Sequence, residues 1–128
     1  MIEMNEFQPA SYESFHHKLF TNQICVEVRK EEGDCWFKLN KNAMFLAMKN
    51  LSKSGFELYM YIASNQEDYK FGLGFQPVYN ATGMSAKSYQ RATQELKEKG
   101  YLVFSGGFVK NDENITAPKW LFYSIPVL

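Results

Sequence analysis

Lys87 and Arg91 are the residues whose type and spacing best suit a chemical task in this chain. They lie four positions apart in a segment, 86–99, whose apolar residues recur every three or four positions. In a helix, both cations would therefore face away from the apolar stripe. A guanidinium can form two hydrogen bonds with guanine, and an ammonium can bind a phosphate. The pair predicts an outward-facing surface for double-stranded DNA.

Other polar side chains of the same region suit neighbouring parts of a DNA duplex. Glutamine amides can bind adenine, hydroxyls beside a helix N-terminus suit phosphate oxygens, and lysines further along can reach flanking phosphates or the minor groove. Glu95 and Glu98 would repel the DNA backbone, so we expect their end of the helix to leave the groove. The predicted DNA-binding residues are Ser85, Lys87, Ser88, Gln90, Arg91, Gln94, Lys110 and Lys119.

The elements that position these residues follow a helix-turn-helix pattern. Pro77 suits the first turn of a short helix over 77–82, and Gly83 tolerates the left-handed conformation that ends it. Ser85 can cap a second helix that runs through Lys99. Strands are predicted over 101–105 and 120–125, with a loop from 106 to 118 between them. A helix-turn-helix followed by such a hairpin is a winged helix.

The chain before this pattern predicts an extension and two more helices. Alternation over 24–28 indicates a strand, and a turn at 31–34 would return it as a second strand over 36–39, with Val26 opposite Leu39. The polar segment 66–75 indicates a loop. The remaining predictions are a short helix capped by Ser11 with Tyr12, Phe15 and Leu19 on one face, a helix capped by Asn40 or Asn42, and a helix capped by Ser52.

These elements predict an α+β fold: a winged helix with an N-terminal helix and β-hairpin extension. We expect residues 1–34 to form the extension and 35–128 to form the winged-helix domain. The predicted core residues are Tyr59, Ile62, Tyr89, Leu96, Leu102 and Trp120.

The segment from Leu51 to Leu102 resembles the helix-turn-helix domains of replication-initiation proteins from phages and plasmids of low-GC Gram-positive bacteria. The resemblance implies a DNA-binding protein of a mobile genetic element that acts in replication or transcription. It covers about 50 residues, fewer than half of the chain. It rests on Leu51-Ser52-Lys53, Tyr59-Met60-Tyr61-Ile62-Ala63-Ser64-Asn65, Ala81-Thr82-Gly83-Met84-Ser85, Ser88-Tyr89-Gln90-Arg91-Ala92 and Glu95-Leu96-Lys97-Glu98-Lys99-Gly100-Tyr101-Leu102.

Composition narrows the choice of function. The 128 residues include 14 Lys and Arg against 14 Asp and Glu, which excludes a generally polybasic nucleic-acid coat. Charge is nevertheless uneven: residues 84–111 hold five basic against two acidic side chains, and residues 1–34 hold three against seven. No apolar run is long enough to cross a bilayer and the first residues lack a signal-peptide core, so we expect a cytoplasmic protein.

The chemistry-bearing residues do not suggest an enzyme. The spacing of Cys25 and Cys35 is not that of a zinc site, and the adjacent His16 and His17 cannot chelate one metal from a helix face. We therefore expect no catalytic residue, metal or cofactor. One alternative stays open: a winged-helix adaptor that binds a replisome component or host protein. Its docking surface, or a homodimer interface, would use Phe7, Tyr12, Phe15 and Phe20.

Overall fold

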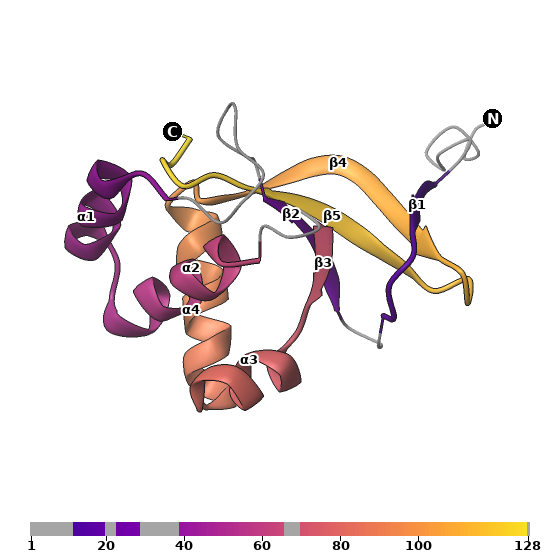
Figure 1. The fold of residues 1–128 in the computed structure, drawn as a ribbon, viewed down its shortest axis with the longest axis horizontal. Coiled ribbons are helices and arrows are strands. Elements are labelled where there is room, and N and C mark those ends of the chain that lie inside the picture. The colour runs from indigo at the N-terminus through magenta and orange to yellow at the C-terminus, as the bar shows by residue number, and fades with distance from the viewer. Residues whose placement is uncertain (1–11, 20–22, 29–38, 66–69, 128) are drawn as a thin grey trace.

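Helices gather at one end of a curled, mixed sheet, and a long hairpin carries the sheet away from them (Figure 1). The computed structural model describes residues 12–19, 23–28, 39–65 and 70–127. The predicted α+β class is confirmed. In chain order the elements are β1 (Glu13–Phe15), β2 (Ile24–Val28), α1 (Lys41–Asn50), α2 (Lys53–Ala63), β3 (Lys70–Leu73), α3 (Phe75–Thr82), α4 (Ala86–Glu98), β4 (Leu102–Asn111) and β5 (Thr116–Phe122).

The sheet has the strand order β1-β4-β5-β2-β3. The β4–β5 hairpin and the β2–β3 pair are antiparallel, whereas β1 runs parallel to β4 and β2 runs parallel to β5. β2 therefore lies between the hairpin and β3, in the interior of the sheet. The predicted boundary at residue 34 falls outside the described residues, and strands from both sides of it share this sheet.

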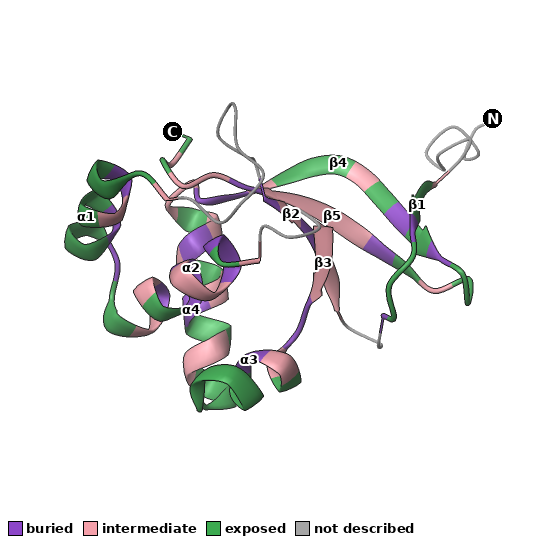
Figure 2. Cartoon of the chain, viewed as in Figure 1, coloured by how far each residue is buried: buried purple, intermediate pink, exposed green. Residues whose placement is uncertain are grey.

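The two faces of the sheet bury different cores, because side chains alternate along each strand. One face, with Val26, Leu102 and Phe122, packs against α2 and α4 in the main core. The other face, with Cys25 and Val109, belongs to a smaller core. Figure 2 shows both sets of buried residues along the strands. Of the predicted core residues, Tyr59, Ile62, Leu96 and Leu102 are buried, and Tyr89 and Trp120 are half-buried against them.

The helix predicted over 12–19 is wrong. β1 occupies part of this segment and pairs in parallel with β4, while Phe15 and Leu19 are buried in the smaller core. Spacings of three and four residues fit a helix, but the open edge of β4 offers backbone hydrogen bonds that a strand can use. Phe15 is therefore not part of an exposed docking surface. Ser11, Phe7 and Phe20 lie outside the described residues.

The pairing predicted for β2 is also wrong. Val26 lies between Phe71 of β3 and Trp120 of β5, so no edge remains for Leu39. The rest of the predicted hairpin, 29–38, lies outside the described residues. The predicted loop over 66–75 contains β3 and the first residue of α3. The glycines at 72 and 74 indicate a loop in the sequence, but backbone pairing with β2 makes residues 70–73 a strand.

Two further boundaries differ from expectation in the hairpin. The predicted loop 106–118 is mostly strand, because β4 continues to Asn111 and β5 already begins at Thr116. An irregularity between Phe104 and Phe108 absorbs the two glycines there, and Gly106 takes a φ of +87°. At its other end, β5 stops at Phe122 instead of reaching Ile125.

Candidate nucleic-acid interface

The helix–turn–helix segment of α3 and α4 forms as its residue types predict. Gly83 has a φ of +77° and its N–H donates to the Tyr79 carbonyl, which ends α3. The Ser85 hydroxyl accepts from the Ser88 N–H at 3.2 Å and begins α4. Met84, between these two caps, is buried in the main core. The turn is therefore anchored, and the first turn of α4 projects beside it (Figure 1).

Lys87 and Arg91 are exposed on α4, as predicted. They lie one helical turn apart, opposite the buried Ala92 and Leu96. Neither cation forms an ion pair with any residue that the structure describes. Gln90 is exposed beside them and Ser88 is half-exposed. The N-terminal half of α4 thus presents two unneutralised cations and hydrogen-bonding groups on one surface, which we call the α4 surface.

Glu95 does not weaken this positive surface, because it is turned toward α2. Its carboxylate accepts from the Ser52 N–H at 2.9 Å and from the Ser52 hydroxyl at 2.7 Å, and Lys99 lies 3.2 Å away. Burial opposes ionisation, but these partners outweigh it and lower the pKa of Glu95. Gly55 permits the contact, since a Cβ there would lie 2.2 Å from the Glu95 Oε1 atom. We call this set of contacts between Glu95, Ser52 and Lys99 the latch; it joins α4 to the N-terminus of α2.

Gln94 lies on the side of α4 that faces β2 and β3. Its amide donates to Glu98 at 3.0 Å, and it lines a groove of about 330 Å³ between α4 and the β2–β3 pair. The groove also contains Tyr89 and Lys97. The Gln94–Glu98 bond places a carboxylate on the C-terminal half of α4, whereas Lys87 and Arg91 lie on its N-terminal half.

The two lysines predicted for the wing have different surroundings. Lys119 is not a free cation: its ammonium lies 2.7 Å from Glu13 and 3.0 Å from Glu27. Burial alone would lower its pKa, but the two carboxylates raise it. Lys119 therefore differs from Lys87 and Arg91, because two carboxylates lie against its ammonium. Lys110 is exposed and lies 5.5 Å from the centroid of the Tyr12 ring, a cation–π arrangement.

A cluster of aromatic residues on the hairpin was missed in the sequence. Phe104 and Phe108 are among the exposed large apolar residues, and both contact neighbouring rings. The predicted strands over 101–105 and 120–125 already contain Phe104 and Trp120, but they do not include Phe108. Since Phe108 was assigned to a loop, its position across from the second of these strands could not be recognised.

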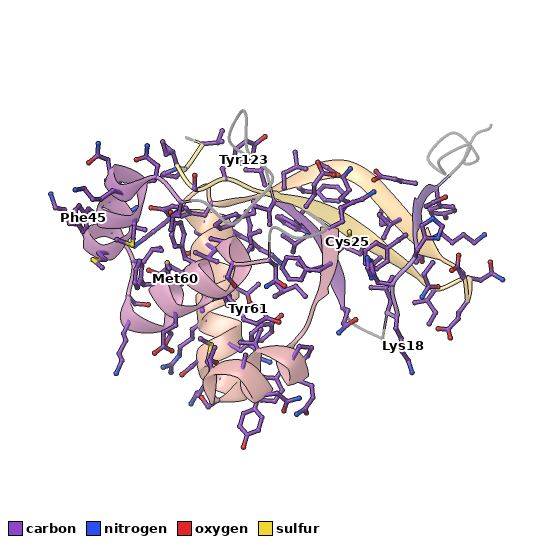
Figure 3. All side chains as sticks on the ribbon, in the orientation of Figure 1. Lys18, Cys25, Phe45, Met60, Tyr61 and Tyr123 are labelled. Carbon is purple, nitrogen blue, oxygen red and sulfur yellow. The ribbon has the colours of Figure 1, made fainter. Side chains whose placement is uncertain are left out.

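A second exposed apolar group lies on α1. The helix buries Ala43 and Ala47 but exposes Phe45, Leu46 and Met48. Figure 3 shows Phe45 on the side of α1 directed away from the rest of the molecule. This surface is distant from the hairpin and shares no element with the α4 surface.

Comparisons with family models, curated proteins and solved structures found no match to the chain. Within the described residues, His, Cys, Asp and Glu form no group of three able to hold a metal ion. No helix in that part of the chain combines the length and apolar character needed to span a membrane. Cys25 is buried, and burial raises its pKa to about 12.

Proposed function

We propose that this protein binds double-stranded DNA in a sequence-specific manner through the α4 surface, without catalysis. The observation that carries the proposal is the pair Lys87 and Arg91, exposed one turn apart on a helix whose N-terminus is capped and whose opposite face is buried. A helix of this kind fits the major groove, where arginine can bind guanine and glutamine can bind adenine. Gln90 adjoins the pair, and Ser85 and Ser88 lie beside the helix N-terminus, where phosphates bind well.

The order of elements from α2 to β5 supports a winged-helix arrangement for this function. Helix α2 is followed by β3, then by the α3–α4 pair and finally by the β4–β5 hairpin. In this proposal α4 is the recognition helix and the hairpin is the wing. The insertion of β2 between β3 and β5 widens the sheet beyond a simple wing. Lys110 on β4 is then the wing lysine that could contact a flanking phosphate.

The resemblance of residues 51–102 to replication initiators supports a role on a mobile genetic element, in replication initiation or transcriptional regulation. Both roles require recognition of a short duplex sequence, and a homodimer would double a half-site contact. The proposed partners are therefore duplex DNA and a second copy of the chain, and the proposed compartment is the cytoplasm.

The test is selection of duplexes from a random pool, followed by titration of the enriched sequence at several salt concentrations. Lys87→Ala and Arg91→Ala should each weaken binding. Lys87→Ala should also reduce the slope of log K against log salt by about one if Lys87 contacts a phosphate. Lys49→Ala is the matched control, because Lys49 is an exposed lysine on α1. Enrichment of no duplex, or equal binding by both α4 variants and the parent, would refute the proposal.

One observation favours a second candidate function, an adaptor that binds a replisome or host protein. The exposed apolar face of α1, formed by Phe45, Leu46 and Met48, resembles a protein-docking surface more than a DNA-binding one. If the chain is an adaptor, Phe45→Ala should release a partner that co-purifies from the source cell while Lys87→Ala retains it. If the chain instead binds duplex DNA, Lys87→Ala should weaken duplex binding while Phe45→Ala leaves it unchanged, which would support the first proposal.

A further inference from the structure

Two exposed aromatic rings and one half-buried ring gather on one face of the β4–β5 hairpin. Phe104 is 44% exposed and Phe108 is 40% exposed, and their ring centroids lie 6.0 Å apart in an edge-to-face arrangement. Trp120 lies opposite Phe104 on β5, with ring centroids 5.5 Å apart. We call these three residues the aromatic face. Exposed apolar side chains that gather on one surface are typical of binding sites, whereas single exposed ones are common on any protein.

Lysines lie at both ends of this patch. The Lys97 ammonium, from α4, lies 4.4 Å from the centroid of the Trp120 ring. Lys110 is two positions beyond Phe108 on β4, so its side chain shares the same face of the sheet. It lies over Tyr12, which extends the row of rings. The rings therefore lie between two cations.

Two carboxylates of neighbouring strands, Glu13 and Glu27, lie on the reverse face of the sheet. Glu13 pairs in register with Val109, a residue of the smaller core, and therefore shares its face. Glu13 and Glu27 both bond Lys119, which is in register with Cys25 on that same face. Alternation along the strands thus separates the charges: the acids and Lys119 lie on one side, and the rings with Lys97 and Lys110 lie on the other.

We propose that the aromatic face binds a single strand of nucleic acid with unpaired bases. Each base has a flat face that stacks on aromatic rings whatever the sequence, while lysines attract the phosphates between bases. A duplex stacks its bases on one another, so it cannot offer them to Phe104 or Phe108. The inference goes beyond the proposed duplex binding and does not rest on it. It shares Lys110 with the proposed wing contact but uses no residue of the α4 surface.

The test measures fluorescence anisotropy of labelled oligo(dT) and oligo(U) of about 20 nucleotides, titrated with the full chain at low salt. Phe104→Ala and Phe108→Ala should each weaken binding about 5- to 100-fold, the range expected for loss of a base-stacking ring. Phe45→Ala is the matched control, because Phe45 is 45% exposed but lies on α1, and it should bind as the parent does. Circular dichroism of each variant verifies folding, which exposed side chains should not disturb.

A second readout reports contact at the rings. In the Trp36→Phe variant, Trp120 is the remaining tryptophan of the two in the chain. Added oligonucleotide should change its fluorescence, because Trp120 contacts Phe104, where a base is expected to stack. Lys87→Ala should leave single-strand binding unchanged even where it weakens duplex binding, which separates this proposal from the previous one. Absence of binding by both oligonucleotides, or equal binding by the Phe104→Ala variant and the parent, would overturn the inference.

Discussion

Replacing Glu95 by glutamine should break the latch that holds α4 on α2. The carboxylate accepts two hydrogen bonds from Ser52, at 2.9 and 2.7 Å. A hydrogen bond to an ionised group contributes about 1.5–3 kcal/mol and a neutral one about 0.5–1.5 kcal/mol, so glutamine loses about 1 kcal/mol for each bond. The ion pair with Lys99 is partly exposed and adds only a few tenths of a kcal/mol. The expected cost is about 2 kcal/mol in the free energy of unfolding at pH 7.

The pH dependence of this loss has a definite sign. The pKa of Glu95 is lowered in the folded state, so its ionised form binds its partners in the folded protein and lacks them in the unfolded chain. The contribution is therefore complete above the unfolded pKa of about 4.3 and is lost as the pH falls through the folded pKa. Below that range, Glu95 is protonated and parent and variant should approach equal stability.

Urea unfolding followed by circular dichroism at pH 7 and near pH 3 measures both effects, provided the slope with urea concentration stays constant. Glu98→Gln is the control, because Glu98 is an exposed glutamate on the same helix and contacts the Gln94 amide. We expect its stability at pH 7 to stay within about 0.5 kcal/mol of the parent. A Glu95→Gln variant as stable as that control, or a deficit that does not shrink as the pH falls below the unfolded pKa, would show that the ionised carboxylate does not stabilise the fold.

Three further variants test separate parts of the structure. Gly55→Ala should displace the Glu95 carboxylate, because a Cβ at this position would clash with it. Alanine also favours the helix by about 1 kcal/mol, so the net loss in the free energy of unfolding should be about 1 kcal/mol. In urea unfolding, the double variant with Gly55→Ala and Glu95→Gln should lose less stability than the sum of the two single losses, because both changes remove the same contacts. Asn111→Ala should cost about 2 kcal/mol or more in urea unfolding, because the buried side chain accepts from the Glu113 and Ile115 N–H groups. In a Cys35→Ser background, Cys25 should react with iodoacetamide at pH 8 no faster than the protein opens, because the thiol is fully buried. Its pKa of about 12 also keeps it protonated in the folded state.

Local signals in the sequence predicted the helical half of the fold. Asn40, Ser52 and Ser85 cap their helices with side-chain oxygens, and Gly83 ends α3 in the left-handed region. These interactions join residues two to four positions apart, so their physics is contained in a short stretch of chain. The same periodicity placed Lys87 and Arg91 on the exposed side of α4.

The sheet required contacts that no short stretch contains. β2 lies between β3 and β5, which both begin more than 40 residues beyond it in the chain. β1 pairs with β4 across a still longer separation, because Glu13 is in register with Val109. A strand can pair with any strand that has unpaired backbone groups. The alternating pattern of β2 therefore predicts a strand but does not predict which strands pair with it.

The candidate sites divide in the same way. Exposure on α4 follows from helical spacing, whereas the neutralisation of Lys119 depends on Glu13 and Glu27 from two other strands. The row of Phe104, Phe108 and Trp120 exists only because the hairpin register brings them to one face. Sequence alone thus determined the local helices and their outward cations, because those depend on near neighbours. Tertiary structure decided which charges remain unpaired and which rings gather, because these depend on strands that meet only in the folded chain.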